Sequence, residues 1–136
     1  MVAIDVVYEG ELRCRVTHGP SGQHLATDAP KDNGGRGEAF SPTDLVAAAL
    51  GSCLLTVMGI VARRHGLDLS GTTAHVEKHM AKDPARRIGK LVVTLTFPQR
   101  FDEVQQTLLE RAALSCPVHH SLRQDVEAPV RFVYPD

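Results

Sequence analysis

The chain has 136 residues, of which 43% are hydrophobic and 23% charged, so its length and composition suit one globular domain over residues 1–136. Its formal net charge of −1 and its aromatic content of 4% argue against a nucleic acid or an anionic membrane as partner. Three cysteines are an odd count, which argues against a secreted disulfide scaffold and for a reducing compartment, so we expect a cytoplasmic protein.

Three strands are predicted in the first part of the chain. Residues 2–8 are rich in β-branched side chains, and residues 10–18 alternate apolar with polar or charged ones. A Gly- and Pro-containing turn follows, so residues 23–28 are expected to pair back as a hairpin. The alternation predicts that Cys14 lies on the apolar face of its strand as a buried small hydrophobe. Residues 29–40 form a Gly-rich polar loop, which suits either a flexible connection or a rim over a site.

A long helix is predicted to begin at Ser41 and to end at about residue 65. Ser41 can cap the helix, and Asp44 sits at the position that completes a capping box. Residues 45–62 carry no charge, so the helix is apolar on nearly all sides and must be buried on all sides. Its Ala, Gly, Ser and Thr content and the polar remainder of the chain favour a soluble core helix over a membrane span.

One small sheet cannot cover such a helix. We therefore infer a homodimer with this helix at its centre, where a second copy of the chain covers the rest of the apolar surface. Gly51 and Ala48 are small residues that would allow the close approach of a neighbouring helix.

The second half of the chain is predicted to hold two strands, two helices and a last strand. Strands are predicted over residues 72–80 and 88–97, a helix over 102–115, a short helix from 117, and a last strand over 129–134. Strands precede and follow helices without strict alternation. The predicted class is therefore α+β, with an antiparallel sheet on one side of the helices.

Two cysteines stand in unusual surroundings. Cys116 directly precedes Pro117, at the first turn of a helix, where the positive end of the helix dipole favours a thiolate. Local sequence therefore predicts that Cys116 is the more acidic thiol. Cys53 lies about three turns inside the long helix, where the ordinary interpretation is a packed core cysteine. A redox role for Cys53 needs a polar neighbour from elsewhere in the protein.

Candidates for that neighbour are charged residues that precede Cys53 in the chain. The candidate cations are Arg36, Arg13 and Arg15, any of which could reach Cys53 across a dimer interface. Asp44 or Glu38 could hold such an arginine in place. Each also has an ordinary interpretation, as a solvated loop or strand charge or, for Asp44, as a helix cap.

A metal site is the other chemical possibility, because Cys116, His119 and His120 are all ligand types and Cys53 could complete the set. The chain has no Cys-x-x-Cys pair, however, and neighbouring helical residues point about 100° apart, so His119 and His120 cannot easily reach one ion. We therefore expect no metal and no other cofactor.

The segment Ser41-Pro42-Thr43-Asp44-Leu45-Val46-Ala47-Ala48-Ala49-Leu50-Gly51-Ser52-Cys53, followed by Cys116-Pro117-Val118-His119, resembles the OsmC family, which includes the organic hydroperoxide reductases. The resemblance extends over nearly the whole chain. It implies an intertwined homodimer in which sheets wrap two long central helices. It also implies a thiol-dependent peroxidase for organic hydroperoxides, in which Cys53 becomes a sulfenic acid, Cys116 resolves it as a Cys53–Cys116 disulfide, and an external dithiol restores both.

The same resemblance implies that an arginine, oriented by a carboxylate, supports the Cys53 thiolate. Arg36 is the predicted arginine because its loop enters the helix that carries Cys53. The hydroperoxide reductases have Glu directly after the helix-start proline, whereas this chain has Thr43 there and Asp44 next. That position of the acid resembles a less-characterised branch of the family. The alternative function is therefore a non-enzymatic OsmC-fold protein, either redox-responsive or binding a small ligand.

Overall fold

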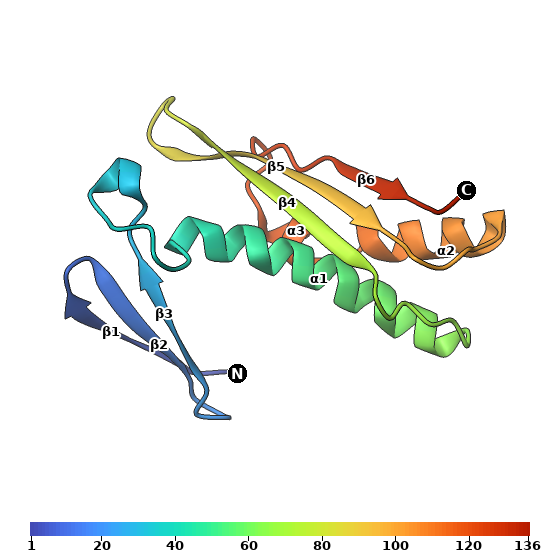
Figure 1. Cartoon of the computed structure of the whole chain (residues 1–136), viewed down its shortest axis with the longest axis horizontal. Coiled ribbons are helices and arrows are strands. Elements are labelled where there is room, and N and C mark those ends of the chain that lie inside the picture. Colours follow the sequence, from blue (N-terminus) through green and yellow to red (C-terminus); the bar gives the residue numbers. More distant parts are fainter. The chain divides into compact units, whose positions relative to one another are not determined.

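The computed structural model describes residues 1–136, which form two compact units, residues 1–46 and residues 47–136. Both units are described separately below. The mixture of helices and strands confirms the predicted α+β class, and every predicted helix and strand is present (Figure 1). The expectation of a single domain over the whole chain stays a prediction.

The first unit is built on a three-stranded antiparallel sheet in the order β1–β2–β3. Its strands are β1 (Ile4–Gly10), β2 (Arg13–His18) and β3 (His24–Asp28), and a 3-10 turn, η1 (Lys31–Asn33), follows them. The hairpin predicted at residues 19–22 is confirmed, with Val16 opposite Leu25. Cys14 is only half-buried, so the prediction of a buried position was wrong. The alternation of residues assigns Cys14 to the apolar face of its strand, but few side chains of this unit cover that face of the sheet.

Helix α1 (Pro42–Arg64) begins with the predicted capping box. The Ser41 hydroxyl oxygen accepts a hydrogen bond from the Asp44 backbone N–H at 3.1 Å, and the Asp44 carboxylate accepts one from the Ser41 N–H at 2.9 Å. The helix ends at Arg64, and Gly66 follows with a positive φ of 67°, which suits a helix C-terminus.

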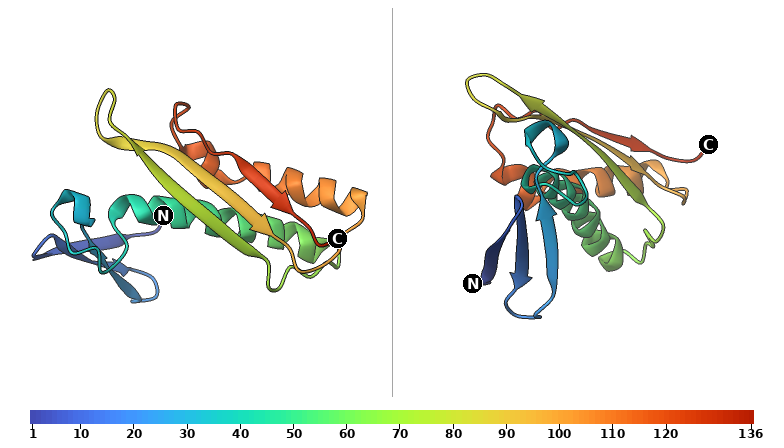
Figure 2. Two further views of the ribbon diagram at one scale, coloured as in Figure 1. Left: turned by 45° about the horizontal axis from the view of Figure 1, so that its top comes forward. Right: turned by 60° about the vertical axis from the view of Figure 1, so that its left-hand side comes forward.

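The second unit packs a three-stranded sheet, in the order β4–β5–β6, against one side of α1 and α2 (Figures 1 and 2). Its further elements are β4 (Thr73–Ala81), β5 (Arg87–Thr96), α2 (Glu103–Leu114), α3 (Pro117–Ser121) and β6 (Val130–Val133). Strand β4 pairs antiparallel with β5, but β6 runs parallel to β5, so this sheet is mixed and not wholly antiparallel as predicted. The parallel pair arises because α2 and α3 form the crossover between these strands.

The core lies between this sheet and the two longer helices. Leu50, Leu54 and Met58 from α1 are buried, as are Leu95 from β5 and Leu109 from α2. Gly51 faces β4, because a Cβ added there would lie 3.0 Å from Val76 Cγ2. Its small size therefore serves the contact between helix and sheet within the chain, and not the helix–helix contact that the sequence suggested.

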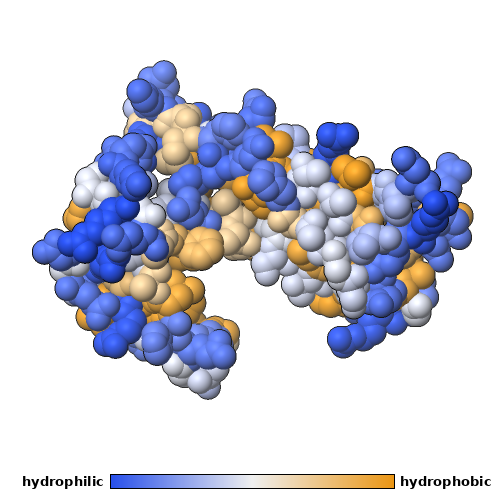
Figure 3. All heavy atoms as spheres, in the orientation of Figure 1, coloured by the Kyte–Doolittle hydropathy of each residue, from blue (hydrophilic) through white to orange (hydrophobic).

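One stripe of α1 is left open. Ala48, Ser52, Thr56 and Ile60, which recur at every fourth position, are exposed. In Figure 3 the surface over the middle of this helix is mostly white to orange, the colours of neutral to hydrophobic residues. By length and composition alone α1 could also cross a membrane. An 18-residue window of this helix has a mean hydropathy of 2.3, and 33% of the window is buried. A core helix of a soluble protein meets the same criteria.

Candidate functional site

Cys53 lies in the third turn of α1 and is half-buried. The helix around Cys53 is held in place by the core, because Leu50, Gly51 and Leu54 are all buried in the second unit. The close approach of Gly51 to Val76 on β4 sets how near the helix lies to the sheet. The backbone that carries the Cys53 sulfur is therefore held by packing on both sides of the residue.

Cys116 stands at the junction between α2 and α3. Its backbone N–H donates to the Ala113 carbonyl at 3.1 Å, which continues the end of α2, and Pro117 begins α3 directly after it. The sulfur caps α3 by accepting a hydrogen bond from the His119 N–H at 3.4 Å. The side chain has no exposed surface. Two helix termini thus fix this thiol inside the protein.

The structure brings Cys53 and Cys116 together. Both are free thiols, and the Cys116 side chain makes a hydrogen bond with Cys53. Burial raises the pKa of the Cys116 thiol above its ordinary value, the hydrogen bond and charge of Cys53 raise it further, and the N–H groups of His119 and Val118 only partly oppose this.

The sequence led us to expect that the helix start at Pro117 lowers the pKa of Cys116, but burial raises that pKa instead. Local sequence showed the helix terminus at Pro117 but could not show that the sulfur would be fully buried, which disfavours the thiolate. A five-residue helix also offers a weak dipole against that burial. Burial therefore favours the neutral thiol of Cys116, whereas the side chain of Cys53 is half-buried and more accessible.

Arg36 lies in the first unit and is well exposed. Its side chain retains 60% of its accessible surface, and its guanidinium lies 3.8 Å from the Glu11 carboxylate. Surface ion pairs of this kind contribute little to stability. Nothing in the first unit holds Arg36 in one orientation beyond this contact, and its predicted role at Cys53 stays a prediction.

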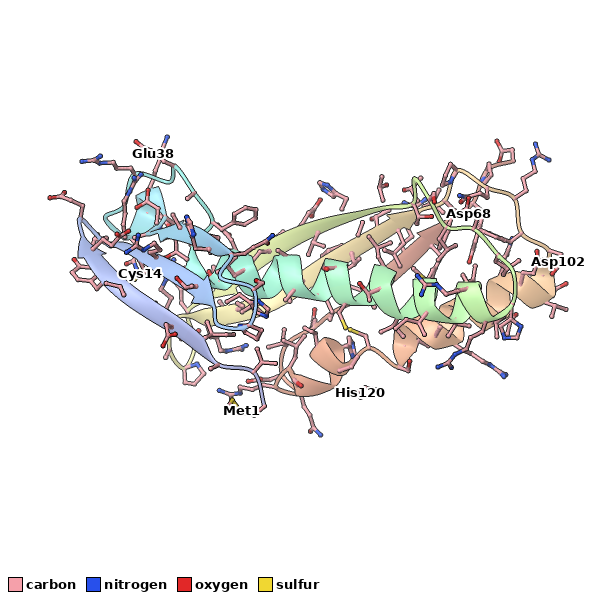
Figure 4. All side chains as sticks on the ribbon, turned by 90° about the horizontal axis from the view of Figure 1, so that it is seen from below. Met1, Cys14, Glu38, Asp68, Asp102 and His120 are labelled. Carbon is pink, nitrogen blue, oxygen red and sulfur yellow. The ribbon has the colours of Figure 1, made fainter.

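Arg13 is held much more firmly. Its guanidinium lies 2.6 Å from the Glu38 carboxylate and 3.4 Å from that of Asp28, whose side chain is buried (Figure 4 labels Glu38). The Glu38 N–H, followed by the charge of Arg13, keeps the pKa of Asp28 below its ordinary value. The sequence analysis did not single out Asp28, because an acidic residue at the end of a strand gives no sign in the sequence that it will be buried. Arg15 pairs only loosely, 3.9 Å from Glu9.

Asp44 is placed at the start of α1, where its carboxylate takes part in the capping box with Ser41. Asp44 therefore acts as part of the helix cap, which is the ordinary interpretation of this residue. Cys53 lies on the same helix about two and a half turns further along. The predicted role of Asp44 in orienting an arginine stays a prediction.

No group of three or more His, Cys, Asp or Glu side chains in the structure could hold a metal ion. The rings of His119 and His120 lie 6.1 Å apart at 89° to each other, as expected for neighbours on one helix.

Comparisons with known proteins give a consistent result. A protein from Psychrobacter arcticus 273-4, provisionally named as an osmotic stress induced and detoxification response protein, is 45% identical, with a TM-score of 0.92 over 97% of this chain and 96% of the other. An organic hydroperoxide resistance protein from Elizabethkingia anophelis, with thiocyanate bound, is 17% identical, with a TM-score of 0.79 over 99% and 96% of the two chains.

The organic hydroperoxide resistance protein OsmC from Legionella pneumophila shares the fold at 18% identity, with a TM-score of 0.78 over 98% of this chain and 96% of that one. No curated protein sequence matches the chain. The family model described as OsmC-like protein matches residues 35–130, which include both Cys53 and Cys116. The chain belongs to the OsmC family.

Proposed function

We propose that this protein is a thiol-dependent peroxidase that reduces organic hydroperoxides. The observation that carries the proposal is the pairing of a half-buried free thiol, Cys53, with a fully buried free thiol, Cys116. Two solved relatives named for organic hydroperoxide resistance share the fold, which supports the substrate class.

The proposed reaction has three steps. The Cys53 thiolate attacks the O–O bond of ROOH, takes one oxygen to become a sulfenic acid, and releases RO⁻, which takes up a proton to leave as ROH. The Cys116 sulfur then attacks the sulfenic sulfur, forming the Cys53–Cys116 disulfide and releasing water. An external dithiol reduces this disulfide by two thiol exchanges, and becomes a disulfide itself.

The surroundings of the two sulfurs support this division of roles. Cys116 stays protonated because it is buried, so its S–H can donate to a Cys53 thiolate and stabilise it. The exposure of Cys53 lets a peroxide approach that sulfur first. The raised pKa of Cys116 predicts that disulfide formation accelerates as pH rises beyond the ordinary thiol range, because the attacking species is the thiolate.

A cation is still needed beside Cys53, and we propose Arg36 for it, with Asp44 as the carboxylate that orients the arginine. Arg13 is the rival, since Glu38 and Asp28 already fix its guanidinium. Removing the acting arginine should lower kcat/KM for cumene hydroperoxide by about a hundredfold. Comparing Arg36→Ala, Arg13→Ala and Arg15→Ala decides among the three candidate cations, and Arg64→Ala, at an exposed arginine at the end of α1, is the control that should leave kcat/KM unchanged. A full rate in Arg36→Ala would remove Arg36 from the site.

We further propose that the protein acts in the cytoplasm as a homodimer. The exposed stripe of α1, from Ala48 to Ile60, and the exposed apolar residues of β1 need cover that the described chain does not supply. A second copy of the chain would supply it.

The test is mass spectrometry and kinetics with cumene hydroperoxide. One equivalent should remove two hydrogens from the protein and link Cys53 to Cys116 in a peptide map. Cys53→Ser should abolish turnover, Cys116→Ser should accumulate the sulfenic acid, and Cys14→Ser, the matched control, should behave as wild type. Full turnover in Cys53→Ser would overturn the proposal. Negligible peroxide consumption by a correctly folded dithiol protein would instead favour a non-enzymatic, redox-responsive or ligand-binding member of the family.

A further inference from the structure

A cavity of about 260 Å³ lies beside α3, on the segment that leads from this helix towards β6. Its size falls just below the range of pockets for drug-sized molecules, and it suits a smaller ligand. Figure 4 shows α3 and the labelled His120, which is one of the lining residues. The full lining consists of His119, His120, Leu122, Arg123, Gln124 and Val126.

The walls of this cavity are held by backbone hydrogen bonds. The Leu122 N–H donates to the His119 carbonyl at 3.3 Å, and the Val126 N–H donates to the Arg123 carbonyl at 3.0 Å, which closes a turn. The Glu127 N–H then donates to the Gly89 carbonyl on β5 at 3.1 Å. The concave shape is therefore set by α3, a closed turn and a strand, and not by a loose loop.

The lining is chemically one-sided. Its four polar side chains, two imidazoles, a guanidinium and an amide, all offer N–H donors, and no carboxylate lines the cavity. The Asp125 carboxylate lies 3.1 Å from the Arg123 guanidinium and 3.8 Å from that of Arg87. Two arginines thus share this one carboxylate, so the three side chains together carry a net positive charge.

We propose that this cavity binds a small anion through a phosphate or carboxylate group. Arg123 would supply the charged fork, one of the two imidazoles of His119 and His120 would supply a further N–H donor, and Leu122 and Val126 would form the apolar floor. The same residue, His119, donates its backbone N–H to the Cys116 sulfur, so an occupant would lie beside the helix that holds the buried thiol. The site does not depend on the peroxidase proposal.

The binding test uses inorganic phosphate and citrate, each titrated into the reduced, full-length protein at constant ionic strength and followed by two-dimensional NMR. The amide signals of residues 119–126 should move, with saturation. Arg123→Gln should weaken binding about tenfold, because a charge-assisted hydrogen bond is lost. Arg64→Gln, an exposed arginine at the end of α1, removes the same charge elsewhere and should change the affinity less than twofold. Tighter binding of phosphate identifies a phosphorylated ligand, and tighter binding of citrate a carboxylate.

A second variant is expected to act in the opposite direction. Asp125→Asn removes the carboxylate that competes for Arg123, so it should tighten anion binding several-fold. The spectra of the free variants show that each one is folded. Signal changes spread evenly over the protein, no saturation for either anion, or equal weakening in Arg123→Gln and Arg64→Gln would each overturn the proposal.

Discussion

Residues 1–46 and residues 47–136 use their apolar side chains in opposite ways. Every buried apolar residue belongs to the second unit, where α1, α2 and the sheet β4–β5–β6 enclose a core. In the first unit the buried side chains are polar: Thr27, Asp28 and Ser41. Its large apolar side chains are mostly exposed, including Val2, Ile4, Val6, Val7, Tyr8 and Phe40.

This difference shows what each unit needs in order to be stable. The second unit buries enough apolar surface to hold its own elements together. A three-stranded sheet whose apolar residues face water gains little from burial, so the first unit needs a cover. The position of the two thiols follows the same division, since both Cys53 and Cys116 lie in the unit that completes its own core.

The difference between the two units is tested most directly by truncating one apolar residue in each of them. Leu95→Ala, in the core of the second unit, should lower the free energy of unfolding by about 2–5 kcal/mol at any protein concentration. Val7→Ala, on the exposed sheet, should have a small effect at high dilution and a larger one as concentration rises, because a second copy then covers β1. Urea denaturation over a hundredfold range of concentration measures both. Similar, concentration-independent losses would contradict the difference between the units.

Two substitutions on α1 sharpen the comparison between its covered and open faces. Ala48→Leu, on the open face, should weaken dimerisation by about 1–3 kcal/mol without changing the fold, because it overpacks a helix contact. Gly51→Leu, on the covered face, should instead destabilise the folded subunit, because even a Cβ there would lie 3.0 Å from Val76 Cγ2. Sedimentation velocity and urea denaturation separate these effects. An unchanged dimer in Ala48→Leu would remove the open stripe from the interface.

The start of α2 offers a test within the second unit alone. The Asp102 carboxylate accepts a hydrogen bond from the Gln105 N–H at 2.8 Å, and the Gln105 side-chain oxygen accepts one from the Asp102 N–H at 3.0 Å. Asp102→Ala should cost about 1 kcal/mol of stability, whereas Asp102→Asn should lose only a fraction, since Asn also caps helices well. Thermal unfolding compares the two. Equal losses would mean that the helix start does not depend on the cap.

A test of pH dependence concerns Tyr134, which stacks on Phe97 with ring centroids 4.7 Å apart. Burial, and then the charge of Glu110, raise the pKa of Tyr134 from 10.0 to about 12. Folding therefore favours the protonated form, so this contribution is complete below pH 10 and is lost as pH rises towards 12. Melting temperatures measured from pH 9 to 11.5 should fall less steeply in Tyr134→Phe than in wild type. Parallel slopes would show that Tyr134 does not titrate as described.

Much of the fold could be predicted from residue patterns. The long uncharged run and the Ser41 cap located α1, and the β-branched run located β5, because these signals lie within a few turns of chain. The parallel pairing of β6 could not be predicted this way, because it depends on where α2 and α3 return the chain. The half-exposure of Cys14 was also beyond the pattern, since alternation gives a face but not what covers it.

The candidate site divides in the same manner. Sequence by itself determined the residue types and the family pattern, which singled out Cys53 and Cys116 from the three cysteines. Only the tertiary structure decided that these two sulfurs interact, that Cys116 is fully buried, and that its thiol is therefore less acidic than its helix position suggests. The reason is that a helix terminus is encoded by neighbours in sequence, whereas desolvation depends on atoms from distant parts of the chain, such as Cys53 on α1, 63 residues earlier.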